Sequence, residues 1–201
     1  MSIRQPRGHC FAALCVGAIL ATVATADLRA FADERPAAGS VRSAALDVVE
    51  TQVRSAFGDI KHIHANTLAA LLRVASDRVV LLDVRTADEF ALSHMAGAIR
   101  VDPDARRTSE IVRLAGPLDG KIVVAYCSIG LRSSRLLVRL NQALREKGAV
   151  ELANLSGGLF RWRNEQRPLV NATGQTAAIH PNNALWRQFL VDDPSQTAKA
   201  D

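Results

Sequence analysis

Short apolar segments of the right length for buried strands alternate along this chain with segments of helical periodicity. Three of them, residues 79–83, 121–126 and 150–155, consist mainly of aliphatic side chains. Runs of this kind are typical of strands buried on both faces of a parallel sheet. The alternation predicts an α/β fold, with a mostly parallel central sheet flanked by helices on both faces.

The helical segments are recognised by apolar residues that recur every three or four positions. The clearest lies over residues 133–147, where four leucines share one face and Gly148 suits the C-terminal end. Thr86 and Glu89 have the Thr-x-x-Glu spacing of a capping box and predict the start of a short helix. Further helices are expected over residues 45–57, 67–75 and 109–114, an edge strand over 60–63, and a short helix after 156–158.

Length and charge limit the classes of protein to which the chain can belong. The chain has 201 residues, 48% of them hydrophobic, which suffices for one good core but is cramped for two domains. Its net charge is +5, without a dense cluster of Lys and Arg or interleaved aromatic residues. That pattern argues against a nucleic-acid partner and fits small anionic substrates better.

The N-terminus has the organisation of an export signal. Arg4 and Arg7 precede an apolar stretch over residues 10–24. Two small-x-small cleavage sites come after it, one ending at Ala26 and the other at Ala32. We expect a signal peptide within residues 1–32, cleaved after Ala26 or Ala32, and a periplasmic location if the source is a Gram-negative bacterium. The alternative is an uncleaved anchor, but the apolar stretch is shorter than the ~20 residues that span a bilayer. No stable membrane insertion is expected after cleavage.

The rest of the chain divides into a lead-in, one domain and an extension. Residues 33–43 are polar and contain Pro and Gly, which predicts a flexible lead-in. The domain is expected over residues 44–170, with its core over 60–170. Residues 171–201 form a C-terminal extension, for which a short docked helix is predicted from Leu185, Trp186, Phe189 and Leu190.

Cys127 is the only one of three cysteines that remains once the signal is removed, because Cys10 and Cys15 lie within it. The mature chain then has no internal disulfide, and a lone cysteine in an exported protein is either an inert core residue or a working thiol. Cys127 lies between the strand predicted over 121–126 and the helix predicted over 133–147. Unpaired N–H groups and the positive end of the helix dipole favour the thiolate there, which is the nucleophilic form.

Three further stretches lie in a specific order and spacing between residues 60 and 170. They are the run 82–98 with Asp83, Arg85, Glu89 and His94, the loop from Cys127 to Ser133, and the run 155–162 with Gly157, Gly158 and Trp162. Together these stretches resemble the rhodanese-like sulfurtransferase family. The resemblance implies a rhodanese-like α/β fold.

The resemblance also implies that Cys127 is the nucleophile of a sulfurtransferase and carries sulfur as a persulfide. Cys127 would take a sulfane sulfur from thiosulfate or a persulfide donor and pass it to a thiol, to cyanide or to a protein acceptor. No metal and no organic cofactor is needed. The loop backbone would form a nest for the anionic sulfur, and Arg132 would offer planar donors to an oxyanion. The substrate-binding residues would be Ser128, Ile129, Gly130, Leu131, Arg132 and Ser133, with Asp83, Arg85 and His94 in support.

Two other functions stay open beside sulfur transfer. Within the same fold, cysteine phosphatases place five residues between Cys and Arg, whereas four separate Cys127 from Arg132, and the narrower loop favours sulfur over phosphate or arsenate. A non-enzymatic module that binds a partner or relays sulfur is the second alternative, although the intact Cys127 and Arg132 count against it. Ser128 stands where many thiosulfate-active members carry a basic residue, and Ile129 and Leu131 make the loop rim apolar. A hydrophobic or protein-borne persulfide donor is therefore a further expectation.

Overall fold

The computed structural model describes residues 38–181 and 186–191. The predicted signal peptide, the first residues of the lead-in and Leu185 lie outside this part of the chain. Among the helices that are described, none is both long enough and apolar enough to cross a membrane.

Five parallel strands form the central sheet, in the order β1-β5-β4-β2-β3. The expected α/β fold with a parallel sheet is confirmed. Strand β4 lies in the centre, paired along one side with β2 and along the other with β5. The strands are β1 (Lys61–Ile63), β2 (Val79–Asp83), β3 (Ile99–Arg100), β4 (Ile122–Tyr126) and β5 (Glu151–Leu155).

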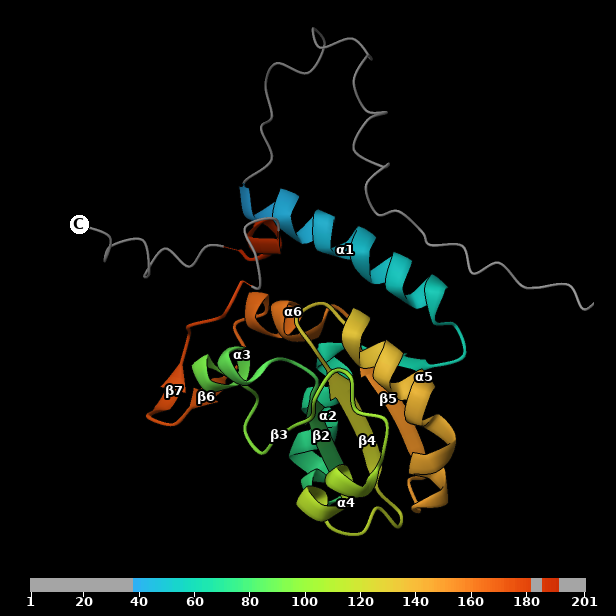
Figure 1. Ribbon diagram of the computed structural model, residues 1–201. Coiled ribbons are helices and arrows are strands. Elements are labelled where there is room, and N and C mark those ends of the chain that lie inside the picture. The colour runs from blue at the N-terminus through green and yellow to red at the C-terminus, as the bar shows by residue number, and fades with distance from the viewer. Residues whose placement is uncertain (1–37, 182–185, 192–201) are drawn as a thin grey trace, which may run out of the picture. The chain divides into compact units, whose positions relative to one another are not determined.

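Helices cover both faces of this sheet (Figure 1). Helices α4 (Ser109–Ala115) and α5 (Leu131–Glu146) pack on one face, and α2 (Ala65–Val74) and α6 (Gly158–Asn164) pack on the other. Alternate side chains of β4 serve the two faces, because Val123 points into the core beneath α5 and Val124 into the core beneath α2 and α6. The sheet is buried on both sides, which explains why its strands read as continuous apolar runs.

The capping box predicted before the short helix α3 (Ala87–Leu92) is present. The backbone N–H of Glu89 donates to Thr86 Oγ1 at 3.3 Å, and the backbone N–H of Thr86 donates to Glu89 Oε2 at 2.9 Å. The capping box therefore fixes the side chain of Glu89 at the start of α3.

A 3₁₀ turn, η1 (Ser76–Arg78), precedes β2.

An antiparallel hairpin of β6 (Leu169–Asn171) and β7 (Gly174–Thr176) follows α6, and the sequence pattern does not predict it. Each strand has three residues, which is too short for a recognisable period. The backbone of Val170 pairs with that of His94, which ties the hairpin to the loop after α3. The boundary expected at residue 170 falls inside this hairpin.

Helix α1 (Ala38–Ala56) lies across the end of the sheet at which α6 and the first turn of α5 are found (Figure 1). Arg161 of α6 holds α1 through ion pairs with Glu50, at 2.6 Å, and with Asp47. The 3₁₀ turn η2 (Trp186–Phe189) contacts α1 from the C-terminal extension. Both flanks of the described chain therefore meet at this end of the sheet.

Candidate active site

Cys127 directly follows β4, the central strand, at its carboxyl end. Its side chain is fully buried, and it is the free cysteine of the described residues. The backbone N–H of Gly130 donates to Cys127 Sγ at 3.2 Å, so the chain turns back over the sulfur. In parallel α/β sheets this end of the strands is where ligands bind. The geometry therefore makes the cysteine loop the candidate reactive centre.

The loop turns at Gly130, which is the residue before α5 and has φ +95°. A left-handed backbone strains any residue that has a side chain, so this turn favours glycine. Helix α5 begins directly after Gly130, at Leu131, rather than at residue 133 as expected. A Cβ at Gly130 would lie 2.9 Å from Nδ2 of the buried Asn154, which leaves no room for one. Asn154 also accepts a 2.6 Å hydrogen bond from Ser133 Oγ, which joins the first turn of α5 to β5.

Helix α6 holds the loop from its other side. The backbone N–H of Leu159 donates to the Cys127 carbonyl at 2.8 Å, and that of Phe160 donates to the Ser128 carbonyl at 3.0 Å. Gly158 has φ +54°, and a Cβ there would meet the Ser128 carbonyl oxygen at 2.7 Å. The glycine pair at the start of α6, Gly157 and Gly158, is therefore needed for this helix to approach the cysteine loop so closely.

Arg132 is held by Glu89, which the sequence indicates as a capping residue and as part of the run 82–98 but not as a partner of Arg132. The guanidinium donates from Nη1 and Nη2 to the two Glu89 carboxylate oxygens, at 2.8 and 2.7 Å. Ser128 Oγ joins the pair, since it donates to Glu89 Oε1 at 3.0 Å and accepts from Arg132 Nη2 at 3.1 Å. Arg132 Nε is buried and has no hydrogen-bond partner among the described residues. Two of the three guanidinium nitrogens are thus occupied by Glu89 and Ser128.

The charges of this network are strongly coupled. Burial would raise the pKa of Glu89, but the hydrogen bonds from Arg132 and Thr86 outweigh it and lower that pKa from 4.5 to about 2. Burial would lower the pKa of Arg132, but the bond to Glu89 and the nearby Cys127 raise it above its ordinary value. Both side chains are therefore charged at neutral pH.

Asp83 and Arg85 form a fully buried ion pair at the end of β2. Arg85 Nε and Nη2 donate to the Asp83 carboxylate at 2.8 and 2.7 Å, and Nη2 also donates to the Ser93 carbonyl at 2.5 Å. Burial would lower the pKa of Arg85, but the hydrogen bond and charge of Asp83 raise it. The pair joins the end of β2 to the end of α3, and among the described residues no hydrogen bond runs from it to the cysteine loop.

His94 lies against α3 and the hairpin rather than in the cysteine loop. Its ring stacks on Phe90 with centroids 3.9 Å apart, and its Nδ1 is 2.9 Å from the Phe90 carbonyl oxygen, which accepts the bond. Its backbone exchanges two 2.8 Å hydrogen bonds with Val170. These contacts order the segment after α3.

Ile129 and Leu131, expected at an apolar rim, belong to an apolar cluster with residues of α1, α6 and the C-terminal extension. Ile129 is 5% exposed. The two side chains therefore pack within the chain. Their role in donor binding, like that of the other loop residues, stays a prediction.

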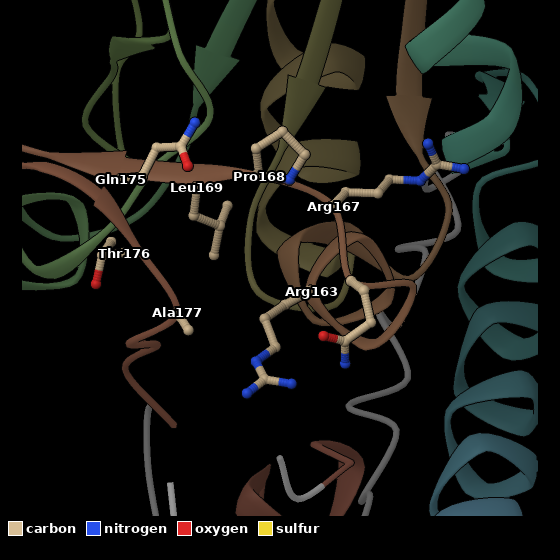
Figure 2. Close-up of a pocket in the computed structure, with 8 residues that line it drawn as sticks. Arg163, Arg167, Pro168, Leu169, Gln175, Thr176 and Ala177 are labelled. Carbon is tan, nitrogen blue, oxygen red and sulfur yellow. The ribbon is translucent and has the colours of Figure 1, made fainter. Parts of the chain in front are cut away.

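A cavity of about 310 Å³ lies between the end of α6 and the β6–β7 hairpin (Figure 2). Arg163 extends toward the open space in this view, whereas Arg167 turns away from it and bonds to Glu165 and Asn66. The cavity is lined by Arg163, Gln166, Arg167, Pro168, Leu169, Gln175, Thr176 and Ala177, none of which belongs to the cysteine loop. The lining of this cavity therefore does not include Cys127 or its loop.

Comparison with known proteins yields relatives that share the central part of the chain. An uncharacterized protein of Synechocystis sp., slr1261, is 30% identical over 103 residues, which make up 51% of this chain and 53% of that protein. The tRNA uridine(34) hydroxylase of Bordetella avium is 27% identical over 119 residues, 56% of this chain and 48% of the hydroxylase. The chain spans about half the length of these curated relatives.

Structure and family comparisons agree on the fold. The BH2092 protein of Bacillus halodurans is similar with a TM-score of 0.50 and 13% identity, over 75% of this chain and 98% of that protein. The family described as Rhodanese-like domain matches residues 65–165, which run from the start of α2 to the end of α6 and include the cysteine loop. The chain therefore belongs to the rhodanese-like domain family.

Proposed function

We propose that this chain is a sulfurtransferase that carries a sulfane sulfur on Cys127. The observation that carries the proposal is the environment of Cys127 Sγ. The Gly130 N–H donates to the sulfur at 3.2 Å, and Arg132, five positions further along the chain, is near enough that Cys127 raises the pKa of its guanidinium. Both groups stabilise a negative sulfur, whether it is the thiolate or the terminal atom of a persulfide.

The proposed reaction has two steps that need no external oxidant. The Cys127 thiolate attacks the outer sulfur of thiosulfate, a new S–S bond forms, and the bond to the sulfonate sulfur breaks with sulfite leaving with the electron pair. An acceptor thiolate or cyanide then attacks the terminal sulfur and releases the Cys127 thiolate. The products are a low-molecular-weight persulfide or thiocyanate, or a persulfide on an acceptor protein.

Arg132 is proposed to bind the anionic donor through Nε. Its two other nitrogens are occupied by Glu89, so the guanidinium is fixed in place before a donor arrives. A charged hydrogen bond of this kind contributes about 1.5–3 kcal/mol. The Ser128 hydroxyl is committed to the same network, since it donates to Glu89 and accepts from Arg132, which argues against a separate role in recognising the donor.

Intact-mass measurement tests the proposal. The chain would carry Cys10→Ser and Cys15→Ser, so that Cys127 is its only thiol, and be incubated with thiosulfate. We expect a gain of one sulfur atom that cyanide removes as thiocyanate. The matched control is Cys127→Ser in the same background, which should gain nothing.

The alternatives give different results in the same preparation. A failure to gain sulfur from thiosulfate, polysulfide and glutathione persulfide alike would contradict sulfur transfer. Hydrolysis of an aryl phosphate or reduction of arsenate without sulfur uptake would favour phosphatase or arsenate reductase chemistry. Uptake of sulfur without its release to any acceptor would favour a storage or relay module.

The N-terminal sequence supports an exported protein, periplasmic in a Gram-negative host, that meets its donor and acceptor outside the cytoplasm. N-terminal sequencing of the protein from its native host tests this proposal. A mature chain that begins after Ala26 or Ala32 is the expected result, and a chain that begins at Met1 would contradict export.

A further inference from the structure

Two segments outside residues 65–165, the range that matches the family, pack against the cysteine loop. Leu46 and Val49 of α1 belong to the same apolar cluster as Ile129 of the loop, and so do Trp186 and Phe189 of η2. Leu46 is fully buried there. We refer to α1 together with residues 186–191 as the cover.

Helix α6 joins the cover to the loop. Arg161 binds Glu50 of α1, as described above, and Asn164 Nδ2 donates to the Phe189 carbonyl at 2.8 Å. The Val191 N–H donates to Asn164 Oδ1 at 3.0 Å. Because the N-terminus of α6 also binds the Cys127 carbonyl, one short helix holds the loop, α1 and the C-terminal segment together.

Cys127 itself has no exposed surface, and the cover packs on Ile129, two residues further along the loop. Cys127, Ser128 and Ser133 are each 0% exposed, and Ile129 is 5% exposed. Sulfur transfer needs the donor sulfur to touch Sγ, so each transfer requires a small local opening. An opening that admits a small anion is smaller than one that admits the surface of a second protein.

From this packing we propose that the cover determines donor specificity: it admits small donors such as thiosulfate or a low-molecular-weight persulfide to Cys127 and excludes persulfides on protein carriers. The proposal rests on the proposed function for its substrates, but not for its geometry. Ile129 and Leu131 serve to anchor the cover instead of forming a docking surface for an apolar donor.

Reaction of the thiol with alkylating reagents of two sizes tests the cover without any sulfur chemistry. The full chain with Cys10→Ser and Cys15→Ser would be treated with iodoacetamide and with a polyethylene-glycol maleimide. In the double variant Val49→Ala and Phe189→Ala we expect the bulky reagent to react roughly 10-fold faster, since loss of partly buried packing raises the open population. The rate with iodoacetamide should change less than about 3-fold, because a small reagent needs less opening.

Val48→Ala is the matched control, since Val48 lies on the same helix but is 58% exposed. It should change neither rate. Cooperative urea unfolding would confirm that the double variant is folded. If it is not, Glu50→Gln, which weakens the Arg161 contact without altering the apolar cluster, replaces it and should shift the ratio of the two rates in the same direction. Unchanged rates in a folded variant, or equal increases with both reagents, would overturn the proposal.

A donor panel separates this inference from the proposed function. We expect the loosened variant to gain turnover with a persulfide on a carrier protein by roughly 10-fold relative to thiosulfate, as the open population rises. If no donor transfers sulfur to the parental chain, the proposed function fails, while the alkylation rates still decide whether the cover limits access. If sulfur transfer occurs and the donor ratio does not move, the cover does not set specificity.

Discussion

Replacing Glu89 with glutamine removes one charge from the network that holds Arg132. Glu89 is 3% exposed and binds Arg132 through both carboxylate oxygens. Glutamine keeps the shape and can still complete a capping box at the start of α3. The variant therefore isolates the ion pair from the helix cap, and it leaves Arg132 as a largely buried cation without its counter-ion.

The size of the effect follows from the pKa of Glu89. Its fall from 4.5 to about 2 corresponds to about 3 kcal/mol of stabilisation, at about 1.36 kcal/mol for each pKa unit. Because the pKa is lower in the folded chain, this stabilisation is fully present above pH 4.5 and is lost as the pH falls toward 2. Glu89→Gln should therefore lower the free energy of unfolding by about 3 kcal/mol at neutral pH, and the difference from the parental chain should narrow below pH 4.5.

Urea unfolding followed by tryptophan fluorescence at several pH values measures both parts of this prediction. Glu110→Gln is the matched control, because Glu110 is an exposed partner of Arg113 at 3.9 Å. That substitution should change stability by less than about 0.5 kcal/mol. A loss for Glu89→Gln below about 1 kcal/mol, or a difference that stays constant from neutral pH to pH 2, would refute the reasoning.

Two further predictions concern the framework of the site. Gly158→Ala should destabilise the fold by at least about 2 kcal/mol and lower the persulfide yield on Cys127, because the new Cβ would clash with the backbone of the cysteine loop. The control is Gly97→Ala, which also has a positive φ but has open space around it, and it should cost only about 1 kcal/mol. Equal losses of stability in the two variants would contradict this account. Asp83→Asn should cost about 3–5 kcal/mol in thermal unfolding because it leaves the fully buried Arg85 without its carboxylate, and a loss below about 1 kcal/mol would show that the charge is satisfied elsewhere.

Local patterns in the sequence suffice for most of the fold. The aliphatic runs of β2 and β4 and the leucines of α5 predict these elements because each is buried along its whole length or along one face. Thr86 and Glu89 are neighbours in sequence, so their capping box is also visible. The β6–β7 hairpin is missed because its strands are only three residues long, too short to show an alternating pattern.

The partners within the candidate site are harder to predict because they are far apart in sequence. Cys127 and Arg132 are recognised from their spacing in one loop. Glu89 lies 43 residues before Arg132, and only the parallel pairing of β2 with β4 brings the two side chains together. The sequence pattern places Ile129 at an apolar rim of the loop, because no local signal indicates that α1 and η2 pack over it.

The two hydrogen bonds from α6 to the cysteine loop have a consequence for the order of events during folding. The carbonyl groups of Cys127 and Ser128 accept from Leu159 and Phe160, which are synthesised later than β4 and α5. A chain that has emerged only as far as α5 therefore holds the thiol in an unfinished loop. Reaction with oxidants is easiest during that interval, and the rate at which α6 docks sets how long the nascent thiol is at risk.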